Sequence, residues 1–383
     1  MRPNEPKVTA YEARESHISR SEWDPRSWSR RIWLILVTII IIIVVAIVAT
    51  VVGVRATRNS GNGKDDRYPN YTRLNYTLVD TYSGTSFFDK FDYFNTYDPA
   101  GGFVHYVSPG DAKLHNLTYA TESTVLIRVD TSVGPGSEPD ASTGRFSVRL
   151  ESKTQYGPGL FLFDVRHTPY GCATWPALWL TDPNNWPTHG EIDIMEAVNQ
   201  ANSGNMVALH TTAGCDMSDI RRSMTGTAGQ GDCHNATNSN TGCIVLATSP
   251  ATYGPAFNAA GGGIVALEWR NEGIRVWVFS RNGAGAQGLT ALPAAGETML
   301  QGPDTQTWGP PLADFPATNC DMARHFRNQS IIVNIDLCGY LTEARWADSG
   351  CSKQKCTDFV ANNPSAFTDA YWEFGGFQVY SAS

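Results

Sequence analysis

The most informative part of this 383-residue chain is the segment Gly190-Glu191-Ile192-Asp193-Ile194-Met195-Glu196-Ala197, in which three acidic residues fall within six positions. Its apolar residues and their alternation favour a β-strand, in which side chains two residues apart share a face. Glu191 and Asp193 therefore point the same way, whereas Glu196 would point to the opposite face of a regular strand. One extra residue, a β-bulge near Met195, would return Glu196 to the face of the other two. The segment predicts a row of three carboxyls on one concave surface.

Such a row suits acid–base and nucleophilic chemistry. The outer Cα atoms would lie about 13 Å apart in a strand, a gap that two inward-leaning Glu side chains would largely close. A carboxyl separation of about 5–5.5 Å suits a retaining glycosidase, and about 6.5–9.5 Å suits an inverting one. Crowding raises the pKa of one carboxyl, which can act as the acid while another stays ionised. An acidic strand edge without function and a calcium site built from these oxygens are the alternative explanations.

The segment resembles the active-site signature E-x-D-x-x-E of glycoside hydrolase family 16, in its bulged form. Two aromatic segments are similar to the fungal laminarinase-like, endo-1,3(4)-β-glucanase branch of that family: Trp175-Pro176-Ala177-Leu178-Trp179 and Asn185-Trp186-Pro187. The resemblance runs from about Thr81 to the C-terminus. It implies a β-jelly-roll domain that cleaves β-glucan with retention of configuration.

Carried over residue by residue, the resemblance makes Glu191 the nucleophile, Glu196 the general acid/base and Asp193 the assisting carboxylate between them. A glucan cleft also needs exposed aromatic platforms, because sugar rings present apolar C–H faces beside hydroxyl edges. Trp179 and Trp186 match sugar-stacking positions of relatives, so we expect both in the cleft. The alternative is core packing, which explains most Trp residues of a β-protein.

The same resemblance implies two further substrate-binding residues. His210 lies on the strand expected after the acidic one, where relatives carry a His near the nucleophile. Arg149 matches an Arg that holds substrate hydroxyls in relatives, with a solvated strand charge as the alternative. Trp175 is expected to be structural. His105 stands where relatives often have Asn.

One segment departs from the family pattern. Fungal relatives tend to have Cys-Gly-Asp-Trp after an Asn-bearing strand, and that Trp lines the cleft, whereas this chain has Cys338-Gly339-Tyr340-Leu341-Thr342-Glu343. The stacking surface is therefore missing, or Tyr340 or Trp346 replaces it. The departure bears on substrate choice rather than on the chemistry.

Residues 80–383 are expected to form one all-β domain. Short segments that alternate apolar and polar residues, or are wholly apolar, predict strands at 125–129, 146–150, 160–166, 206–211, 265–269, 274–279 and 331–335. Asn271-Glu272-Gly273 indicates a hairpin between two of them. Because long helical periodicity is absent, the pattern predicts a β-jelly-roll sandwich of two antiparallel sheets, as in concanavalin-like folds, which the resemblance also implies.

The N-terminal part predicts a membrane anchor. Residues 1–31 are polar, of mixed charge, and read as a disordered cytoplasmic tail. Ile32 to Val54 is an almost unbroken apolar run, long enough for a single transmembrane helix. The run is too long and begins too late for a cleaved signal peptide. Residues 55–79 contain a polar, Gly-bearing stretch and are expected to be a stalk.

Glycosylation motifs and cysteines indicate which side of the membrane the domain occupies. Five Asn-x-Ser/Thr motifs follow the apolar run and none precedes it, at Asn70, Asn75, Asn116, Asn235 and Asn328. All eight cysteines also follow it, which is typical of disulfides in an oxidising compartment. We therefore expect a single-pass type II membrane protein with a luminal or extracellular catalytic domain.

Other classes of function fit the sequence poorly. The formal net charge of −8 and the absence of a basic block argue against nucleic-acid binding. We expect no organic cofactor, since there is no Gly-rich phosphate loop, and no metal site is indicated. The sequence predicts an endo-hydrolase of β-1,3- or mixed β-1,3/1,4-glucan, with β-glucan and the membrane as partners. The alternatives are a cell-wall glucan transglycosylase that uses the same acids and an inactive, glucan-binding lectin-like domain.

Overall fold

The structure is a computed structural model that describes residues 29–31, 34–35, 38–39, 68–134, 144–283, 285, 289 and 302–382. The chain divides into two units, residues 1–63 and 64–383. The predicted tail and anchor, residues 1–31 and 32–54, lie almost entirely outside the described residues. No helix in the part of the chain that is described is long and apolar enough to cross a membrane.

The second unit is built mainly of strands, with short helices in the connections. The strands are β1 (Tyr76–Tyr82), β2 (Phe91–Tyr93), β3 (Val104–Tyr106), β4 (Thr118–Ala120), β5 (Val125–Arg128), β6 (Arg145–Ser147), β7 (Arg149–Ser152), β8 (Gly159–His167), β9 (Thr174–Thr181), β10 (Glu191–Glu196), β11 (Met206–His210), β12 (Thr227–Ala228), β13 (Cys243–Leu246), β14 (Gly263–Arg270), β15 (Gly273–Ser280), β16 (Ala313–Pro316), β17 (Ser330–Leu337) and β18 (Tyr371–Ala382). The α-helices are α2 (Pro109–Leu114), α3 (Gly254–Ala259), α4 (Met322–His325), α5 (Gly339–Ala344) and α6 (Cys356–Asn362). The 3₁₀ helices are η2 (Gly84–Lys90), η4 (Asn238–Asn240), η5 (Pro250–Thr252), η7 (Thr305–Thr307), η8 (Ala317–Asn319) and η9 (Pro364–Phe367).

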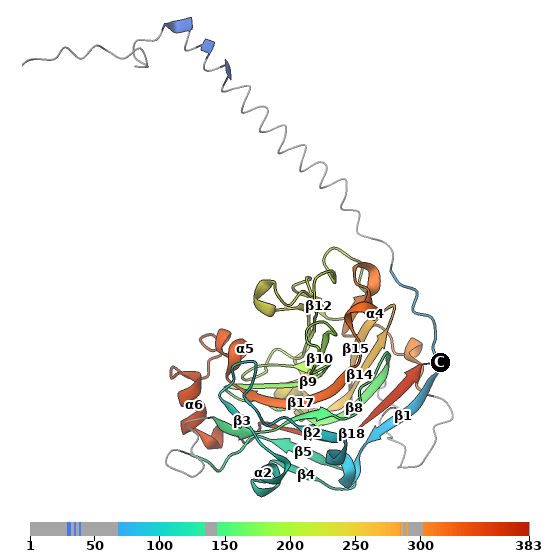
Figure 1. Cartoon of the computed structure of the whole chain (residues 1–383), viewed down its shortest axis with the longest axis vertical. Helices are drawn as coiled ribbons and strands as arrows, with labels where there is room; N and C mark the ends of the chain where they lie inside the picture. The colour runs from blue at the N-terminus through green and yellow to red at the C-terminus, as the bar shows by residue number, and fades with distance from the viewer. Residues whose placement is uncertain are drawn as a thin grey trace, which may run out of the picture. The chain divides into compact units, whose positions relative to one another are not determined.

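Two eight-stranded sheets lie over one another as curved layers (Figure 1). The acid sheet, which contains β10, has the strand order β12-β13-β11-β10-β9-β17-β7-β2. The opposite sheet has the order β16-β15-β14-β8-β18-β5-β4, and β1 also pairs with β18. Strand pairs in both sheets are antiparallel, whereas the small separate pair β3–β6 is parallel. The predicted all-β sandwich of antiparallel sheets is therefore confirmed.

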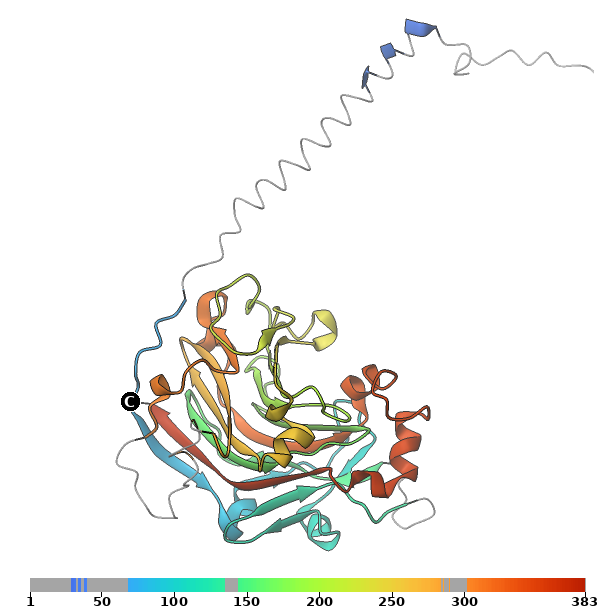
Figure 2. The same ribbon diagram turned by 180° about the vertical axis from the view of Figure 1, so that it is seen from behind.

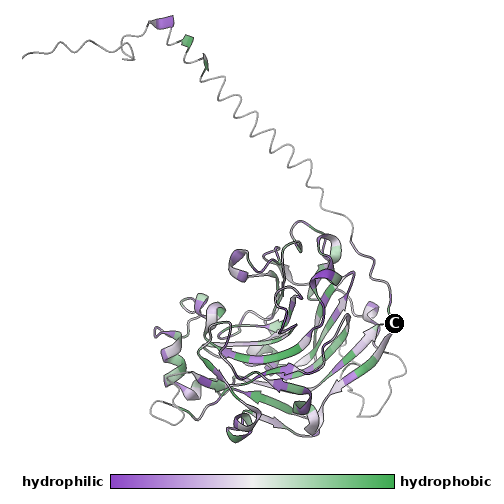
Figure 3. Ribbon diagram, in the orientation of Figure 1, coloured by the Kyte–Doolittle hydropathy of each residue, from purple (hydrophilic) through white to green (hydrophobic). Residues whose placement is uncertain are grey.

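The main core lies between the sheets, and strand β8 shows why the sequence produces it. Phe161 and Phe163 belong to the main core, whereas the alternate residues Leu160 and Leu162 belong to a smaller apolar cluster. A strand buried on both faces reads as a continuous apolar run. Coloured by hydropathy, the strands of both sheets carry bands of apolar residues (Figure 3).

The predicted hairpin is confirmed by the pairing of β14 with β15, which runs from Gly263 opposite Ser280 to Arg270 opposite Gly273. The domain begins earlier than predicted, however. Tyr71 and Tyr76 are buried, and β1 pairs with β18 from Tyr76 onward. Because these residues pack into the sandwich, the expected stalk, residues 55–79, overlaps with the folded unit.

All eight cysteines form disulfides, as predicted: Cys172–Cys351, Cys215–Cys320, Cys233–Cys243 and Cys338–Cys356. The last bond joins the residue that precedes α5 to the first residue of α6, and these two helices lie together at one edge of the sandwich (Figure 2). The Cys215–Cys320 and Cys233–Cys243 disulfides cross-link the long connections around β11, on the acid sheet.

Candidate active site

The predicted bulge is present in β10. Two steps along β10, from Asp193 to Met195, are matched by a single step along β9, from Trp179 to Leu178. The pairing with β11 is interrupted at the same place. Consecutive residues Ile194 and Met195 are both fully buried in the core. The bulge therefore returns Glu196 to the face that carries Glu191 and Asp193, and we call these three residues the acid row.

An asparagine that sequence reasoning missed holds the bulge. The side-chain oxygen of Asn205 accepts from the Glu196 N–H at 3.1 Å, and its amide donates to the Ile194 carbonyl at 2.8 Å. Asn205 is itself buried. A bulge removes backbone groups from the sheet ladder, and buried backbone groups need other partners. No sequence motif marks Asn205, because the requirement arises only once the strands are paired.

Asp193 and Glu196 are buried and Glu191 is partly buried, and the pKa values of all three carboxyls are raised. Burial, followed by the charge of Glu191, raises the pKa of Asp193 to about 6. Burial, followed by the charge of Asp193, raises the pKa of Glu196 to about 7, against a hydrogen bond from Trp175. Burial also raises the pKa of Glu191, while the charge of His210 opposes that rise. Near neutral pH the row can therefore hold a proton on Glu196, as a general acid requires.

His210 lies directly opposite Glu191 in the β10–β11 pairing. Its Nε2 is 3.3 Å from Asp193 Oδ2 and 4.0 Å from Glu191 Oε1. Burial by itself would lower the pKa of His210, but the contact with Asp193 and the charge of Glu191 raise it to about 10. The side chain is therefore a buried imidazolium against two of the three carboxyls.

Two of the tryptophans singled out in the sequence make hydrogen bonds on this face. Trp175, expected to be structural, donates its indole N–H to Glu196 Oε1 at 2.7 Å, so it supports a residue of the acid row directly. Trp179 donates to Asn334 Oδ1 at 2.9 Å, and Asn334 donates in turn to the Tyr106 hydroxyl at 3.1 Å. These bonds fix both rings beside the acid row, since β9 is the strand next to β10.

Trp186 and Arg149 are placed differently from each other. Trp186 is exposed, and its indole lowers the pKa of Glu191, which places it beside that carboxyl. Arg149 is buried: its Nη2 lies 2.8 Å from Glu151, and its guanidinium lies over the rings of Phe94 and Trp179. An Arg with these partners supports the Trp179 ring, and its part in holding substrate hydroxyls stays a prediction.

The two aromatic residues considered as replacements for the missing tryptophan also differ. Trp346 is partly buried against the core and donates its indole N–H to the Gln354 carbonyl at 2.8 Å, so it is not an open platform. Tyr340 is 72% exposed at the start of α5, and the next residue on its N-terminal side, Gly339, packs against Trp175. Tyr340 is therefore the aromatic residue of this segment that is available to a ligand.

His105 is placed apart from the acid row. It lines a hollow of about 420 Å³ together with Asn95, Asp111, His115 and Phe146, and no residue of the acid row lines that hollow. The imidazole of His105 lies against Phe146, which is opposite it in the β3–β6 pair. No contact between His105 and the acid row is found in the described residues.

Comparison with known proteins decides the family. Residues 91–380 match the family description "XgeA-like, catalytic GH16 domain". The chain belongs to glycoside hydrolase family 16. Over 318 residues, 82% of this chain and 71% of the other, this family 16 chain is 43% identical to a probable glycosidase of Schizosaccharomyces pombe. It is 38% identical to an endo-1,3(4)-β-glucanase of Arthroderma benhamiae, over 80% of this chain and 65% of that protein, so it spans less than two thirds of that relative.

Solved structures of family 16 enzymes also resemble the domain. Laminarinase 16A from Phanerochaete chrysosporium, with β-glucans in its donor and acceptor sites, superposes with a TM-score of 0.73 and 42% identity, over 80% of this chain and 99% of that one. An elongating family 16 β-1,3-glucosyltransferase superposes with a TM-score of 0.70 and 34% identity, over 80% and 100% of the two chains. The predicted glycoside hydrolase is thus confirmed at the level of the family.

One set of residues has ligand atoms close enough to hold a metal ion, among the residues described: Glu191, Asp193 and His210, within 4.8 Å of one another. The same atoms form the ion pairs described above. A metal-bound histidine uses an unprotonated ring nitrogen, whereas the raised pKa of His210 favours a protonated one, so we assign these atoms to an ion-pair network. The expectation of no metal stays a prediction.

Proposed function

We propose that this family 16 protein is a retaining endo-β-glucanase that cleaves β-1,3- or mixed β-1,3/1,4-glucan in cell-wall glucan metabolism. The observation that carries the proposal is the bulge in β10, because it brings three carboxyls with unequal environments onto one face. The names of the relatives support the substrate class, since they include endo-1,3(4)-β-glucanases and a laminarinase with bound β-glucans.

The chemistry follows from the two outer carboxyls. Glu191 attacks the anomeric carbon, and Glu196 gives its proton to the leaving glycosidic oxygen, which forms a covalent glycosyl-enzyme. Glu196 then removes a proton from water, which hydrolyses the intermediate and restores the starting state. Trp175 suits this exchange, since its N–H donates to Glu196 Oε1 and fixes the carboxyl in place. Asp193 holds the His210 cation beside Glu191 and so assists ionisation of the nucleophile.

Substrate binding is assigned to the aromatic residues around the row. Trp186 offers an exposed ring beside Glu191, and Trp179 presents a ring held by Asn334 and Arg149. Exposed aromatic rings in a polar groove suit the C–H faces of glucose units. Tyr340 supplies a further ring on the side of Trp175 and Glu196.

Transfer to a second sugar instead of water is the one competing function with a specific observation in its favour. The glucosyltransferase with a TM-score of 0.70 is described as elongating. An acceptor sugar would have to replace water at the Glu196 side, where Tyr340 is exposed. A lectin-like role is less well supported, because a binding domain has no need for a row of three carboxyls with raised pKa values.

The full chain incubated with laminarin-type oligosaccharides and, separately, with mixed-linkage glucan tests these functions. Hydrolysis is expected to give products shorter than the starting oligosaccharide, and the linkages left in the products identify the substrate. Products longer than the starting oligosaccharide would replace hydrolysis by transfer. Binding without any new product would leave only the lectin-like role.

We further propose that Ile32 to Val54 anchors the protein as a single-pass type II membrane protein with the catalytic domain luminal or extracellular. The four disulfides support this, because such bonds persist in oxidising compartments. Four of the five Asn-x-Ser/Thr asparagines, Asn70, Asn75, Asn116 and Asn328, are exposed on the domain. A loss of apparent mass after enzymatic removal of N-glycans, in protein recovered from cell membranes, is the expected result. An unglycosylated protein in the cytosolic fraction would contradict it.

A further inference from the structure

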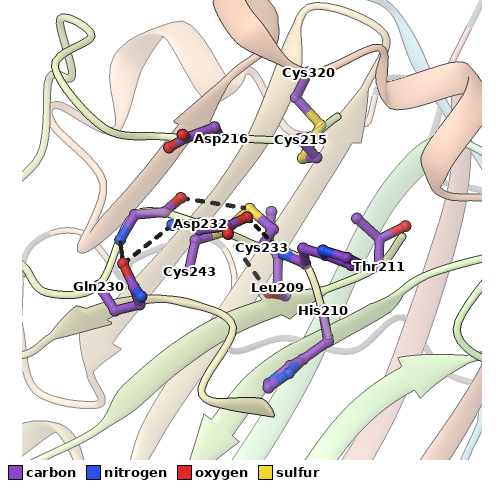
Figure 4. The surroundings of a disulfide bond; sticks show 12 residues. Leu209, His210, Thr211, Cys215, Asp216, Gln230, Asp232, Cys233, Cys243 and Cys320 are labelled. Atoms are coloured by element: carbon purple, nitrogen blue, oxygen red, sulfur yellow. Dashed lines mark hydrogen bonds between the residues drawn. A yellow bond between two sulfur atoms is a disulfide. The ribbon is translucent and has the colours of Figure 1, made fainter. Parts of the chain in front are cut away.

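The loop between Cys233 and Cys243 forms a bracket over His210, and we call it the cystine loop. On one side of His210, the Thr211 N–H donates to the Cys233 carbonyl at 2.8 Å. On the other side, Leu209 pairs with Cys243 across β11 and β13. The disulfide between the two cysteines closes the loop. Figure 4 shows this bond beside Leu209, with His210 and Thr211 following on the same strand.

The backbone conformation of the cystine loop brings it against the imidazole of His210. Asn238, Ser239 and Asn240 all have left-handed backbone conformations, with φ between 49° and 57°. Three such residues in succession are uncommon, and Asn tolerates this conformation better than most residues. Gly242, also at positive φ, passes so close that a Cβ would lie 2.7 Å from Cε1 of His210. The loop therefore packs directly against the ring.

Asn240, at the tip of the cystine loop, contacts one particular nitrogen of the His210 ring. Asn240 Oδ1 lies 3.2 Å from Nδ1 of His210, on the side opposite the acid row. Nε2 faces Asp193 and Glu191, whose oxygens are acceptors. Oxygen atoms thus face both ring nitrogens. Acceptor oxygens on both sides favour the form in which both nitrogens carry a proton, the cation, which forms an ion pair with Asp193 at 3.3 Å.

We propose that Asn240, presented by the cystine loop, is a positioning residue that keeps His210 doubly protonated and so fixes where the proton of the acid row resides. Among the described residues, the charged groups that face His210 come from β10, namely Glu191, Asp193 and Glu196, while the loop contributes the neutral amide of Asn240 and the backbone of Gly242. With the cation in place, Asp193 and Glu191 stay ionised. The proton of the row then remains on Glu196.

This inference rests on the proposed function and deepens it. It adds to the catalytic site a residue, Asn240, whose contact is with His210 and not with the acid row. Asn240 is exposed, but its contact with Nδ1 is partly buried, so removing the acceptor at position 240 weakens the partnering of Nδ1–H, which is costly. His210 then becomes neutral at a lower pH, and above that pH the acid row loses the positive charge beside it. Substrate contacts are unchanged, so kcat is expected to fall at alkaline pH while KM stays the same.

The test compares three variants of the full chain. Asn240→Leu removes the acceptor, Asn240→Asp keeps an oxygen at the same place, and Ser239→Ala changes a neighbouring loop residue for which no contact to His210 is found. In Asn240→Leu we expect the alkaline limb of the pH profile of kcat/KM, where His210 loses its proton, to move to lower pH by about one unit, which is tenfold at a pH on that limb. Asn240→Asp and Ser239→Ala should keep the wild-type limb.

An NMR titration of the His210 ring gives a readout that does not need activity. The pKa of His210 is expected to fall in Asn240→Leu and to hold or rise in Asn240→Asp, with thermal unfolding used to show that each variant is folded. An unchanged His210 titration in folded Asn240→Leu would overturn the inference, even if the wild type hydrolyses glucan. Should Asn240→Leu fail to fold, a lowered His210 pKa in Asn240→Ala decides in favour and an unchanged one against. An inactive wild type whose His210 still responds would instead overturn the proposed function alone.

Discussion

Each sheet of the sandwich holds a cluster of charged side chains built around at least one buried carboxyl, and the two clusters differ in how their charge is balanced. On the opposite sheet, Glu268 is fully buried and accepts hydrogen bonds from the Tyr76 hydroxyl at 2.7 Å, from the Thr305 hydroxyl at 2.8 Å and from Arg275. Arg270 lies 3.8 Å from the same carboxylate. One negative charge is thus surrounded by two guanidinium groups and two hydroxyls.

In the acid row, negative groups outnumber positive ones. Three carboxyls share one imidazolium, that of His210, and the nearby guanidinium of Arg149 is already paired with Glu151. Since the deficit of positive charge cannot be removed by ionic pairing, it is met by retained protons and raised pKa values. Balanced charge fixes a structure, whereas incompletely balanced charge leaves a proton that can be exchanged. The difference identifies the acid row as the reactive cluster.

The largest expected effect is on activity, from Glu191→Gln. Replacing the nucleophile by a neutral amide of the same shape should lower kcat on the order of 10⁴-fold or more, as for other catalytic nucleophiles. The fold should be kept, because the change removes a buried charge from a crowded group. Initial rates on a soluble β-glucan, together with thermal unfolding of the same sample, measure both. Residual hydrolysis within tenfold of wild type would remove Glu191 from the mechanism.

The corresponding substitution in the cluster around Glu268, Glu268→Gln, should lower stability and leave activity unchanged. Glu268→Gln leaves the buried guanidinium of Arg275 without its carboxylate, while Arg270 keeps Glu272 at 3.2 Å, and breaking a buried ion pair costs about 3–5 kcal/mol. The free energy of unfolding should fall by that amount while kcat/KM per folded molecule is kept. Urea unfolding and rate measurements below the transition check this. Loss of activity without loss of stability would show that the distinction between the two clusters is wrong.

Sequence reasoning located the acid row because its signal is local. Glu191 and Asp193 alternate, and Glu196 follows at an odd spacing, so a bulge was needed to bring all three to one face. The pairing of β10 with β9 and β11 contains that bulge. The hairpin of β14 and β15 was predictable for the same reason. Sequence reasoning also took all the cysteines to be paired, but it could not say which with which.

What the sequence could not show are contacts made between distant segments. Trp175 was expected to be structural, because nothing in the chain marks that its N–H meets Glu196 across β9 and β10. Asn205 and Asn240 are single polar residues in connections, and their partners are defined only by the strand register. The stalk was extended too far, since burial of Tyr71 depends on the opposite sheet, where its hydroxyl contacts Asp314.

A smaller effect is expected from loosening the bulge itself. Asn205→Ala leaves the Glu196 N–H and the Ile194 carbonyl buried without partners, at a cost of about 2 kcal/mol in the free energy of unfolding. Because the same bonds orient Glu196, kcat should fall as well. Asn205→Asp keeps the acceptor but places a buried carboxylate against the Ile194 carbonyl, so a loss at least as large as in Asn205→Ala is expected. Equal stability of Asn205→Ala and wild type would show that the bulge holds without this side chain.

The subtlest consequence of the unbalanced row is a pH dependence of stability that can be assigned to Glu196. Its pKa in the folded protein, about 7, lies above the ordinary value of 4.5 because burial and then Asp193 disfavour its charged form. The folded state thus binds this proton more tightly than the unfolded state does, and its contribution to stability is lost as the pH rises from about 4.5 to about 7.

Glu196→Gln removes that loss, since the amide stays neutral at every pH. The variant should unfold at the same temperature as wild type at pH 4 and be more stable at pH 8, by up to about 3 kcal/mol. His210 loses its own contribution between about pH 6.5 and 10 in both proteins, so it leaves the difference largely unchanged. Melting temperatures at the two pH values measure the effect. A variant no more stable than wild type at pH 8 would mean that Glu196 is ionised in the resting protein, and the general acid would have to be sought elsewhere in the row.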